Sequence, residues 1–205
     1  MTPEFRPWVV PFEVTGDRTT DSNDPVRPNQ ATPAIMSSPE TLEAFWPTDL
    51  FDKGLGWVII ARIKAGGRKV VVGIFLIDVF CRGVKKAYHE VCTLEDYHQC
   101  IRKHYLSEFS MEQIPPSRAR ALVEQAVRFA MALGLPPGAN YDKASRIFAQ
   151  IPASKDDESF TFGKDGKPFY VSGPNDTEAE SRRAIEQLDR RCGPGNFHYI
   201  VQMPI

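Results

Sequence analysis

The chain has 205 residues, a net charge of −1 at pH 7 and 42% hydrophobic residues. These values are ordinary for a globular protein that buries a substantial core. The nearly neutral charge excludes a protein that is basic as a whole, as many nucleic-acid binders are, but allows a local basic patch. No run of ~18 apolar residues predicts a membrane span, and the first residues lack the basic region of a signal peptide. We therefore expect a cytoplasmic protein with reduced cysteines and no membrane partner.

Residues 1–37 are predicted to form a flexible arm, followed by a single domain at 38–205. Seven of the 17 prolines lie in about the first 40 residues, and the run 15–30 is almost free of apolar side chains. Such a stretch buries too little surface to offset the entropy lost on ordering. A small apolar cluster lies near the tip of the arm, at Trp8, Val9, Val10 and Phe12. It is either a segment that docks on its own domain or a short motif that binds a partner.

Helices are predicted from capping residues, from breakers and from apolar residues at helical spacing. The expected ranges are 38–47, 93–105, 117–134 and 140–150, and a last helix capped by Asn175, Asp176 or Thr177 and running to about Arg191. In the first, Ser38 is the expected cap, Pro39 takes the first helical position and Pro47 ends the helix. Thr93, Ser117 and Asn140 are the expected caps of the next three. The longest helix should bury Ala119, Leu122, Val123, Ala126, Val127, Ala130 and Met131.

Strands are predicted where the apolar pattern changes its period. Residues 57–64 and 69–80 predict a β-hairpin whose turn holds two glycines, and the second strand is apolar enough to be central in a sheet. Residues 159–162 and 168–172 predict a second hairpin around an Asp-Gly turn, and 197–202 a last strand. The order predicts an α+β fold, with a mostly antiparallel sheet built from two hairpins and a C-terminal strand. Helices should pack on one face of that sheet.

Several short sequence blocks have a particular spacing. They are GIFLID at 73–78, CRGVK at 81–85, FGKDGKPF at 162–169, GPND at 173–176 and CGPGNFHY at 192–199. In these blocks the chain resembles a group of uncharacterised bacterial proteins. The resemblance implies one continuous domain from about 50 to 205, and it implies no activity.

Four residues form a candidate zinc site: His89, Cys92, Cys100 and His104. Zinc prefers four such ligands, usually in two close pairs, and His89-x-x-Cys92 and Cys100-x-x-x-His104 have usable spacing. Residues 100 and 104 would share one face of a helix. The chain has no Cys-x-x-Cys pair, and cysteines also serve as small core residues. We therefore expect no cofactor, with zinc as the alternative.

Asp78 and Lys85 form a candidate catalytic pair. Asp78 ends the most apolar strand, where a buried carboxylate needs a partner. Metal-dependent nucleases often use an acid at such a position, with a lysine and further acids nearby. Cys81 as a nucleophile with His89 as its base is a further alternative. The structural alternative is that Asp78 caps the turn before Gly83 or pairs with Lys85.

Candidate binding residues lie in the C-terminal third: Lys164, Lys167, Asn175, Arg183 and Arg190. Lys164 and Lys167 precede a strand-to-helix connection at Asn175, and the N-terminus of a helix favours anions. Arg183 and Arg190 share a helix face, and such basic faces attract phosphate backbones. The alternatives are ordinary helix capping and a solvated helix on which acids alternate with arginines.

These observations give two functional hypotheses. The first is a non-catalytic binding or accessory module that recognises a protein partner, with nucleic acid as an alternative partner. The second is a metal-dependent hydrolase or nuclease that uses Asp78 and Lys85. An enzyme must bring these residues and a third group together at a concave site open to solvent. A binding module should instead expose an apolar or basic patch.

Overall fold

A computed structural model describes residues 41–64, 66–152, 159–174 and 176–201, all of which belong to one compact unit. The predicted arm at 1–37, with its apolar cluster near Trp8, lies outside the described residues. In the described part of the chain, no helix is both long enough and apolar enough to cross a lipid bilayer.

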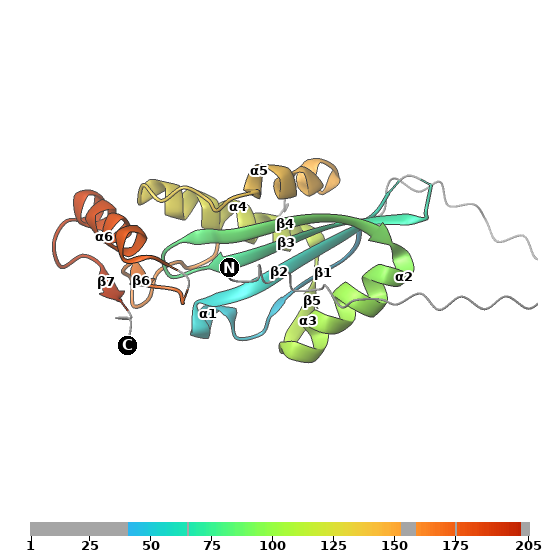
Figure 1. The fold of residues 1–205 in the computed structure, drawn as a ribbon, viewed down its shortest axis with the longest axis horizontal. Coiled ribbons are helices and arrows are strands. Elements are labelled where there is room, and N and C mark those ends of the chain that lie inside the picture. The colour runs from blue at the N-terminus through green and yellow to red at the C-terminus, as the bar shows by residue number, and fades with distance from the viewer. Residues whose placement is uncertain (1–40, 65, 153–158, 175, 202–205) are drawn as a thin grey trace, which may run out of the picture. The chain divides into compact units, whose positions relative to one another are not determined.

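The main sheet has five antiparallel strands in the order β4-β3-β2-β1-β5 (Figure 1). Their bounds are Thr41–Pro47 for β1, Leu55–Ile63 for β2, Lys69–Asp78 for β3, Gly83–Thr93 for β4 and Met111–Ile114 for β5. The predicted hairpin is confirmed, because β2 pairs with β3 along its whole length. Its turn contains two glycines at positive φ. Strand β3 lies inside the sheet and is buried on both faces, as its continuous apolar run indicates.

Helices cover both faces of this sheet, so the α+β class is confirmed but the expected one-sided packing is wrong. One face packs on α4 (Pro116–Ala132), α5 (Tyr141–Ala144) and the 3-10 helix η2 (Ser145–Gln150). The other packs on a continuous helical segment: α2 (Leu94–Asp96), the π-helical η1 (Tyr97–Arg102) and α3 (Lys103–Glu108). Val58 of β2 shares a core with Leu122 of α4, whereas the adjacent Trp57 contacts Tyr105 of α3 at 5.9 Å. Figure 1 shows the two helical layers above and below the strands.

The predicted helix at 38–47 is wrong, because the described part of this segment is strand β1, preceding the short helix α1 (Leu50–Lys53). Phe45 and Trp46 are both buried, and they contact different layers. The Arg102 guanidinium of η1 lies 5.3 Å from the Phe45 ring, and the Arg118 guanidinium of α4 lies 4.5 Å from the Trp46 ring. Consecutive residues that face opposite sides have the period of a strand.

A smaller C-terminal layer consists of β6 (Phe169–Val171), α6 (Glu178–Cys192) and β7 (His198–Ile200). The predicted last strand at 197–202 is β7, and it pairs in parallel with β6. The predicted Asp-Gly turn is present, since Lys164 and Lys167 form an isolated antiparallel bridge around it. The two strands of the predicted second hairpin are wrong, because β6 pairs with β7 and residues 159–162 form no strand. Phe160 and Phe162 instead pack on Trp46 and on Phe129 of α4, at 5.9 and 5.1 Å between rings. Burial of these rings holds the segment without strand pairing.

Helical segments occupy the other predicted ranges, but their caps and types differ in part. The range 140–150 is α5 followed by the 3-10 helix η2, and Asn140, at φ +66°, makes no side-chain capping hydrogen bond. Thr93 caps α2, and its Oγ1 accepts the Asp96 N–H at 3.0 Å. Helix α4 begins at Pro116, one residue before the expected cap, and it buries the predicted face except for Met131, which is 58% exposed. Thr177 caps α6 in a capping box with Glu180.

Candidate functional site

Asp78 lies at the end of β3, where the chain turns toward β4. Its Oδ1 accepts hydrogen bonds from the N–H groups of Phe80, at 2.9 Å, and Cys81, at 3.0 Å. The residue is only 7% exposed. Burial raises the pKa of Asp78, and the backbone donors and the Lys85 charge oppose this rise. This geometry is that of an aspartate whose side chain closes a turn, and it favours the structural alternative.

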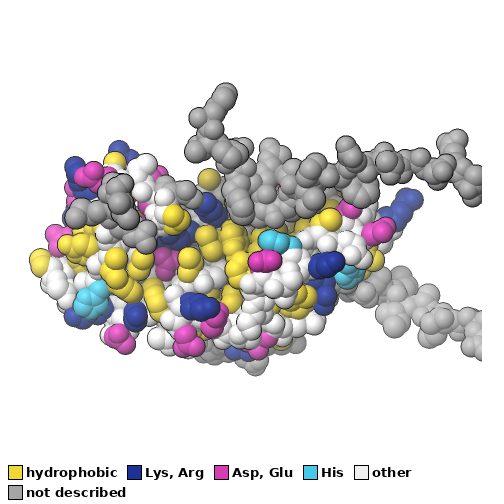
Figure 2. All heavy atoms as spheres, turned by 60° about the horizontal axis from the view of Figure 1, so that its bottom comes forward, with side chains coloured by type: hydrophobic (Ala, Val, Ile, Leu, Met, Phe, Trp, Pro, Cys, Tyr) yellow, Lys and Arg dark blue, Asp and Glu magenta, His cyan; other side chains and the backbone are white. Residues whose placement is uncertain are grey.

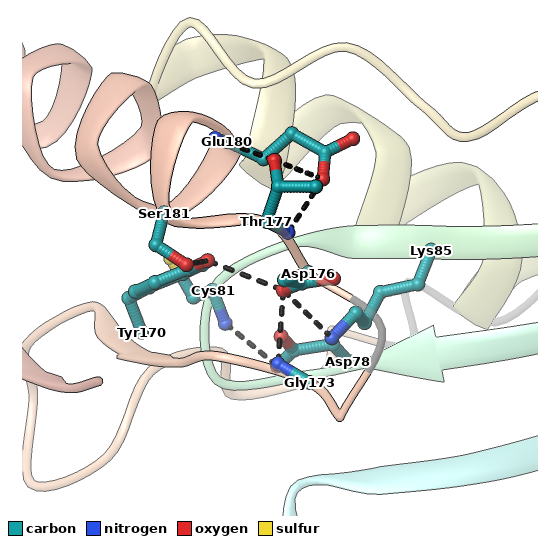
Figure 3. A network of polar contacts seen from close by, with 9 residues as sticks. All are labelled: Asp78, Cys81, Lys85, Tyr170, Gly173, Asp176, Thr177, Glu180 and Ser181. Carbon is teal, nitrogen blue, oxygen red and sulfur yellow. Dashed lines mark hydrogen bonds and ion pairs between the residues drawn. The ribbon is translucent and has the colours of Figure 1, made fainter. Parts of the chain in front are cut away.

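Lys85 of β4 belongs to a polar network that links the sheet to the C-terminal layer (Figure 3). Its Nζ lies 3.8 Å from Oδ2 of Asp176. The same oxygen accepts the Gly173 N–H at 2.9 Å and the Tyr170 hydroxyl at 3.2 Å. The Tyr170 hydroxyl also lies 3.2 Å from the Ser181 hydroxyl of α6. The partner of Lys85 in this network is therefore Asp176, which the sequence analysis considered only as a helix cap.

The Asp176 carboxylate is held in its charged form. Burial by itself would raise its pKa, but the hydrogen bonds from Gly173 and Tyr170 and the charge of Lys85 together lower the pKa. Since both side chains of the ion pair are mostly shielded from solvent, at 13% exposure for Lys85 and 21% for Asp176, loss of the carboxylate leaves a poorly solvated ammonium.

We predict that Asp176→Asn destabilises the protein by about 1–3 kcal/mol at pH 7, because it removes the charge opposite Lys85 and weakens two hydrogen bonds. The lowered pKa of Asp176 means that the unfolded chain binds a proton before the folded chain does. The advantage of the wild type should therefore shrink as the pH falls from about 4 through the lowered pKa. Urea unfolding of both proteins across this pH range measures the difference. A difference that stays constant with pH would show that the charge contributes nothing.

The structure does not bring Cys81 and His89 together. Cys81 is fully buried, and burial raises the pKa of its thiol, so the nucleophilic thiolate is disfavoured. Gly83, two residues after Cys81, pairs with Asp78 at one end of β3, whereas His89 pairs with Gly73. This register separates position 89 from position 83 by roughly 20 Å along β4. His89 is therefore too far from Cys81 to act as the base for its thiol.

The four candidate zinc ligands are not gathered at one site. His89 and Cys92 are three residues apart on β4, so their side chains point to opposite faces of the sheet. Burial, with Asp96, Glu90 and Cys100 nearby, raises the pKa of the Cys92 thiol to about 11. Among the residues that the structure describes, no three His, Cys, Asp or Glu side chains are grouped in a way that could hold a metal. The sequence analysis did not predict that residues 89 and 92 lie on a strand.

The two candidate lysines of the C-terminal layer make contacts inside that layer. The Lys164 Nζ lies 5.3 Å from the centre of the Phe169 ring, and the Lys167 Nζ donates to the Gly195 carbonyl at 2.8 Å. Asn175 lies outside the described residues. The N-terminus of α6 already has an acceptor of its own, because the Thr177 hydroxyl accepts the Glu180 N–H.

The two candidate arginines of α6 are both exposed. Arg183 is exposed, and the Arg190 Nε donates to the Glu186 carbonyl of its own helix at 3.2 Å. Acids lie between these arginines along α6, and the neighbouring Arg182 pairs with Glu178. This pattern is typical of a solvated helix with internal ion pairs.

A pocket that the sequence did not reveal lies where the end of β1, α1, the start of β2 and the end of α3 meet. Its volume is about 270 Å³. Apolar side chains make up most of its lining: Pro47, Leu55, Trp57, Leu76 and Phe109. Leu55 is 46% and Phe109 39% exposed, so the rim itself is apolar. Figure 2 shows hydrophobic side chains gathered across the middle of this side of the molecule.

The charges around this pocket are few and unbalanced. Lys53 pairs with Asp49 at 2.6 Å, so these two cancel. Glu108 also lines the pocket, and within the described residues no cation forms an ion pair with it. Pockets for small molecules usually have ~300–1,000 Å³. This pocket is slightly smaller, so it has room for one large apolar side chain. The charge of Glu108 favours a basic residue next to that side chain. None of the sequence-predicted site residues lines it.

Comparisons of the chain with models of protein families, with curated proteins and with solved structures found no match. A candidate function therefore depends on the geometry of the described residues.

Proposed function

We propose that this chain is a non-catalytic binding module that recognises a protein partner through the pocket between α1 and α3. One observation carries the proposal: a concave surface with an exposed apolar rim at Leu55 and Phe109. Exposed apolar patches of this kind mark interaction sites more often than isolated surface residues do. The hydrolase alternative stays a prediction, and it gains no support from the pocket, which neither Asp78 nor Lys85 lines.

The occupant that fits is a segment of a partner protein with one large apolar side chain beside a lysine or arginine. The apolar side chain would fill the pocket over Trp57, between Leu55 and Phe109. The basic residue would face Glu108, which has the uncompensated charge of the rim. Interfaces obtain most of their affinity from a few such buried anchors surrounded by a rim that excludes water.

We expect Phe109→Asp to weaken partner binding by at least about tenfold, because it places a charge where the partner's apolar anchor would be buried. Leu55→Asp on the opposite rim should act in the same way. The measurement is affinity capture from cell extract with the full chain as bait, followed by a titration of the protein that the wild type recovers. Both side chains are substantially exposed, although Phe109 also stacks on the buried Tyr105 at 6.0 Å, so thermal unfolding of each variant verifies that it folds.

The matched control is Met131→Asp on α4, which also replaces an exposed apolar side chain with a charge but lies outside the pocket. The proposal expects the partner to be retained by the wild type and by Met131→Asp, and lost by the two rim variants. Equal recovery by all four proteins would contradict recognition through this pocket.

A further inference from the structure

The tip of the β2–β3 hairpin has a cluster of positive charges. Lys64, Arg68 and Lys69 are exposed, and the segment 62–69 contains four cations and no acid. Gly66 and Gly67 form the turn at positive φ, with open space where a side chain would be. The hairpin tip lies at one end of the molecule, next to α2 (Figure 1), and dark blue side chains stand out at that end in Figure 2.

These cations are not used within the described fold. No ion pair of the described residues includes Lys64, Arg68 or Lys69. The acids near Thr93, which pairs with Lys69, are Glu90 on β4 and Glu95 and Asp96 on α2. Of these, Asp96 accepts the Thr93 hydroxyl at 2.7 Å. This tip therefore differs from α6, where acids alternate with the arginines.

Lys64 and Lys69, the two lysines of the tip, lie opposite each other on the two strands of the hairpin. The Lys64 N–H donates to the Lys69 carbonyl at 2.7 Å, and the register beside them pairs Ile63 with Val70. Lys64 and Lys69 are thus directly opposite and project to the same side of the ribbon. Like charges in this position destabilise a strand pair. An anion bound between them would relieve that repulsion, so the arrangement favours a polyanionic partner.

We infer that the β2–β3 hairpin tip, defined by Lys64, Arg68 and Lys69, binds the phosphate backbone of a nucleic acid. A two-stranded ribbon is narrow enough to enter a major groove, and the two glycines allow its backbone to approach the phosphates closely. Lysine and arginine side chains on either side of the turn would contact phosphates, which position the protein without reading sequence. This inference goes beyond the proposed recognition of a protein and does not depend on it.

The test is the salt dependence of binding to a short fluorescein-labelled DNA duplex, measured by fluorescence anisotropy on the full chain. Each neutralised phosphate contributes about −0.9 to the slope of log K against log salt. The triple variant Lys64→Gln, Arg68→Gln, Lys69→Gln should therefore have a slope smaller by about 2.7. Raising the salt from about 50 to about 200 mM should therefore weaken binding by the wild type roughly 40-fold more than it weakens binding by the variant. The same titration with a single-stranded RNA shows whether the hairpin tip prefers duplex DNA or single-stranded RNA.

The matched control is Arg128→Gln, Lys143→Gln, Arg146→Gln, which removes the same charge from exposed positions of the α4, α5 and η2 layer. Wild-type affinity and slope in this control, with both reduced in the hairpin variant, would support the inference. It would be overturned by wild-type behaviour of the hairpin variant, by equal losses in both triple variants, or by a wild type that binds neither nucleic acid at about 50 mM salt. All three cations are exposed at a turn, and thermal unfolding of the variants verifies that they fold.

Discussion

Replacing Gly83 with alanine is expected to destabilise the protein by about 3 kcal/mol or more, or to prevent its folding. Gly83 begins β4 at φ +59°, and an added Cβ would lie 2.4 Å from the Ala126 carbonyl oxygen and 2.8 Å from the Ala130 Cβ. Ala126 and Ala130 are fully buried in α4, so the helix cannot move away without opening the core. The backbone strain contributes about 1–2 kcal/mol and the overpacking about 1–3 kcal/mol. Urea unfolding followed by circular dichroism measures the loss.

Gly67→Ala is the matched control, because Gly67 also has positive φ, at +74°, but open space around its Cβ position. It should cost only the backbone strain, about 1 kcal/mol. The difference between the two variants isolates the close approach of β4 to α4. Equal losses would mean that this approach is not a constraint on the fold.

Asp78→Ala is expected to cost about 3–5 kcal/mol of unfolding free energy. It removes the acceptor of two backbone N–H groups at the buried end of β3, and each donor left unsatisfied costs about 1–3 kcal/mol. Asp78→Asn keeps an acceptor oxygen of similar shape and should cost much less. The same unfolding measurement compares the two variants. A stable Asp78→Ala protein would contradict the structural role that we assign to this carboxylate.

The pH dependence gives a second readout for Asp78. Burial raises its pKa, so above the ordinary pKa the folded protein retains a proton that the unfolded chain has already released. The stability contributed by this proton is fully present below the unfolded pKa and is lost as the pH rises through the raised pKa. Asp78→Asn cannot titrate, so its stability should not show this decrease. Parallel pH profiles of the two proteins would contradict the raised pKa.

The parts of the fold that the sequence predicts are those with local signals. The β2–β3 hairpin has a glycine turn between two apolar strands, and α4 and α6 have helical spacing and recognisable ends. Strand β4 was not predicted. It is an edge strand with many polar residues, among them Lys85, Lys86, His89 and Glu90, so its apolar positions form no clear pattern in the sequence. β1 was misassigned because Ser38 and Pro39 imitate a helix start, whereas pairing with β2 and β5 determines the structure.

In the candidate site, too, only contacts between residues that are close in sequence could be predicted. The role of Asp78 as a turn cap could be anticipated, because the groups that it accepts from are two and three residues away. The pairing of Lys85 with Asp176 could not, because the two residues lie far apart along the chain. The pocket was also hidden, since the exposure of Leu55 and Phe109 depends on how β2 and α3 meet.

Recognition of a protein through the pocket between α1 and α3 is tested most directly by site-specific photocrosslinking. A photoreactive phenylalanine analogue replaces Phe109 in one protein and Met131 in another, and each is irradiated in cell extract. We predict a covalent adduct with one partner protein from position 109, identified by mass spectrometry, and none with that partner from position 131. No adduct from position 109, or the same adducts from both positions, would contradict the proposed function.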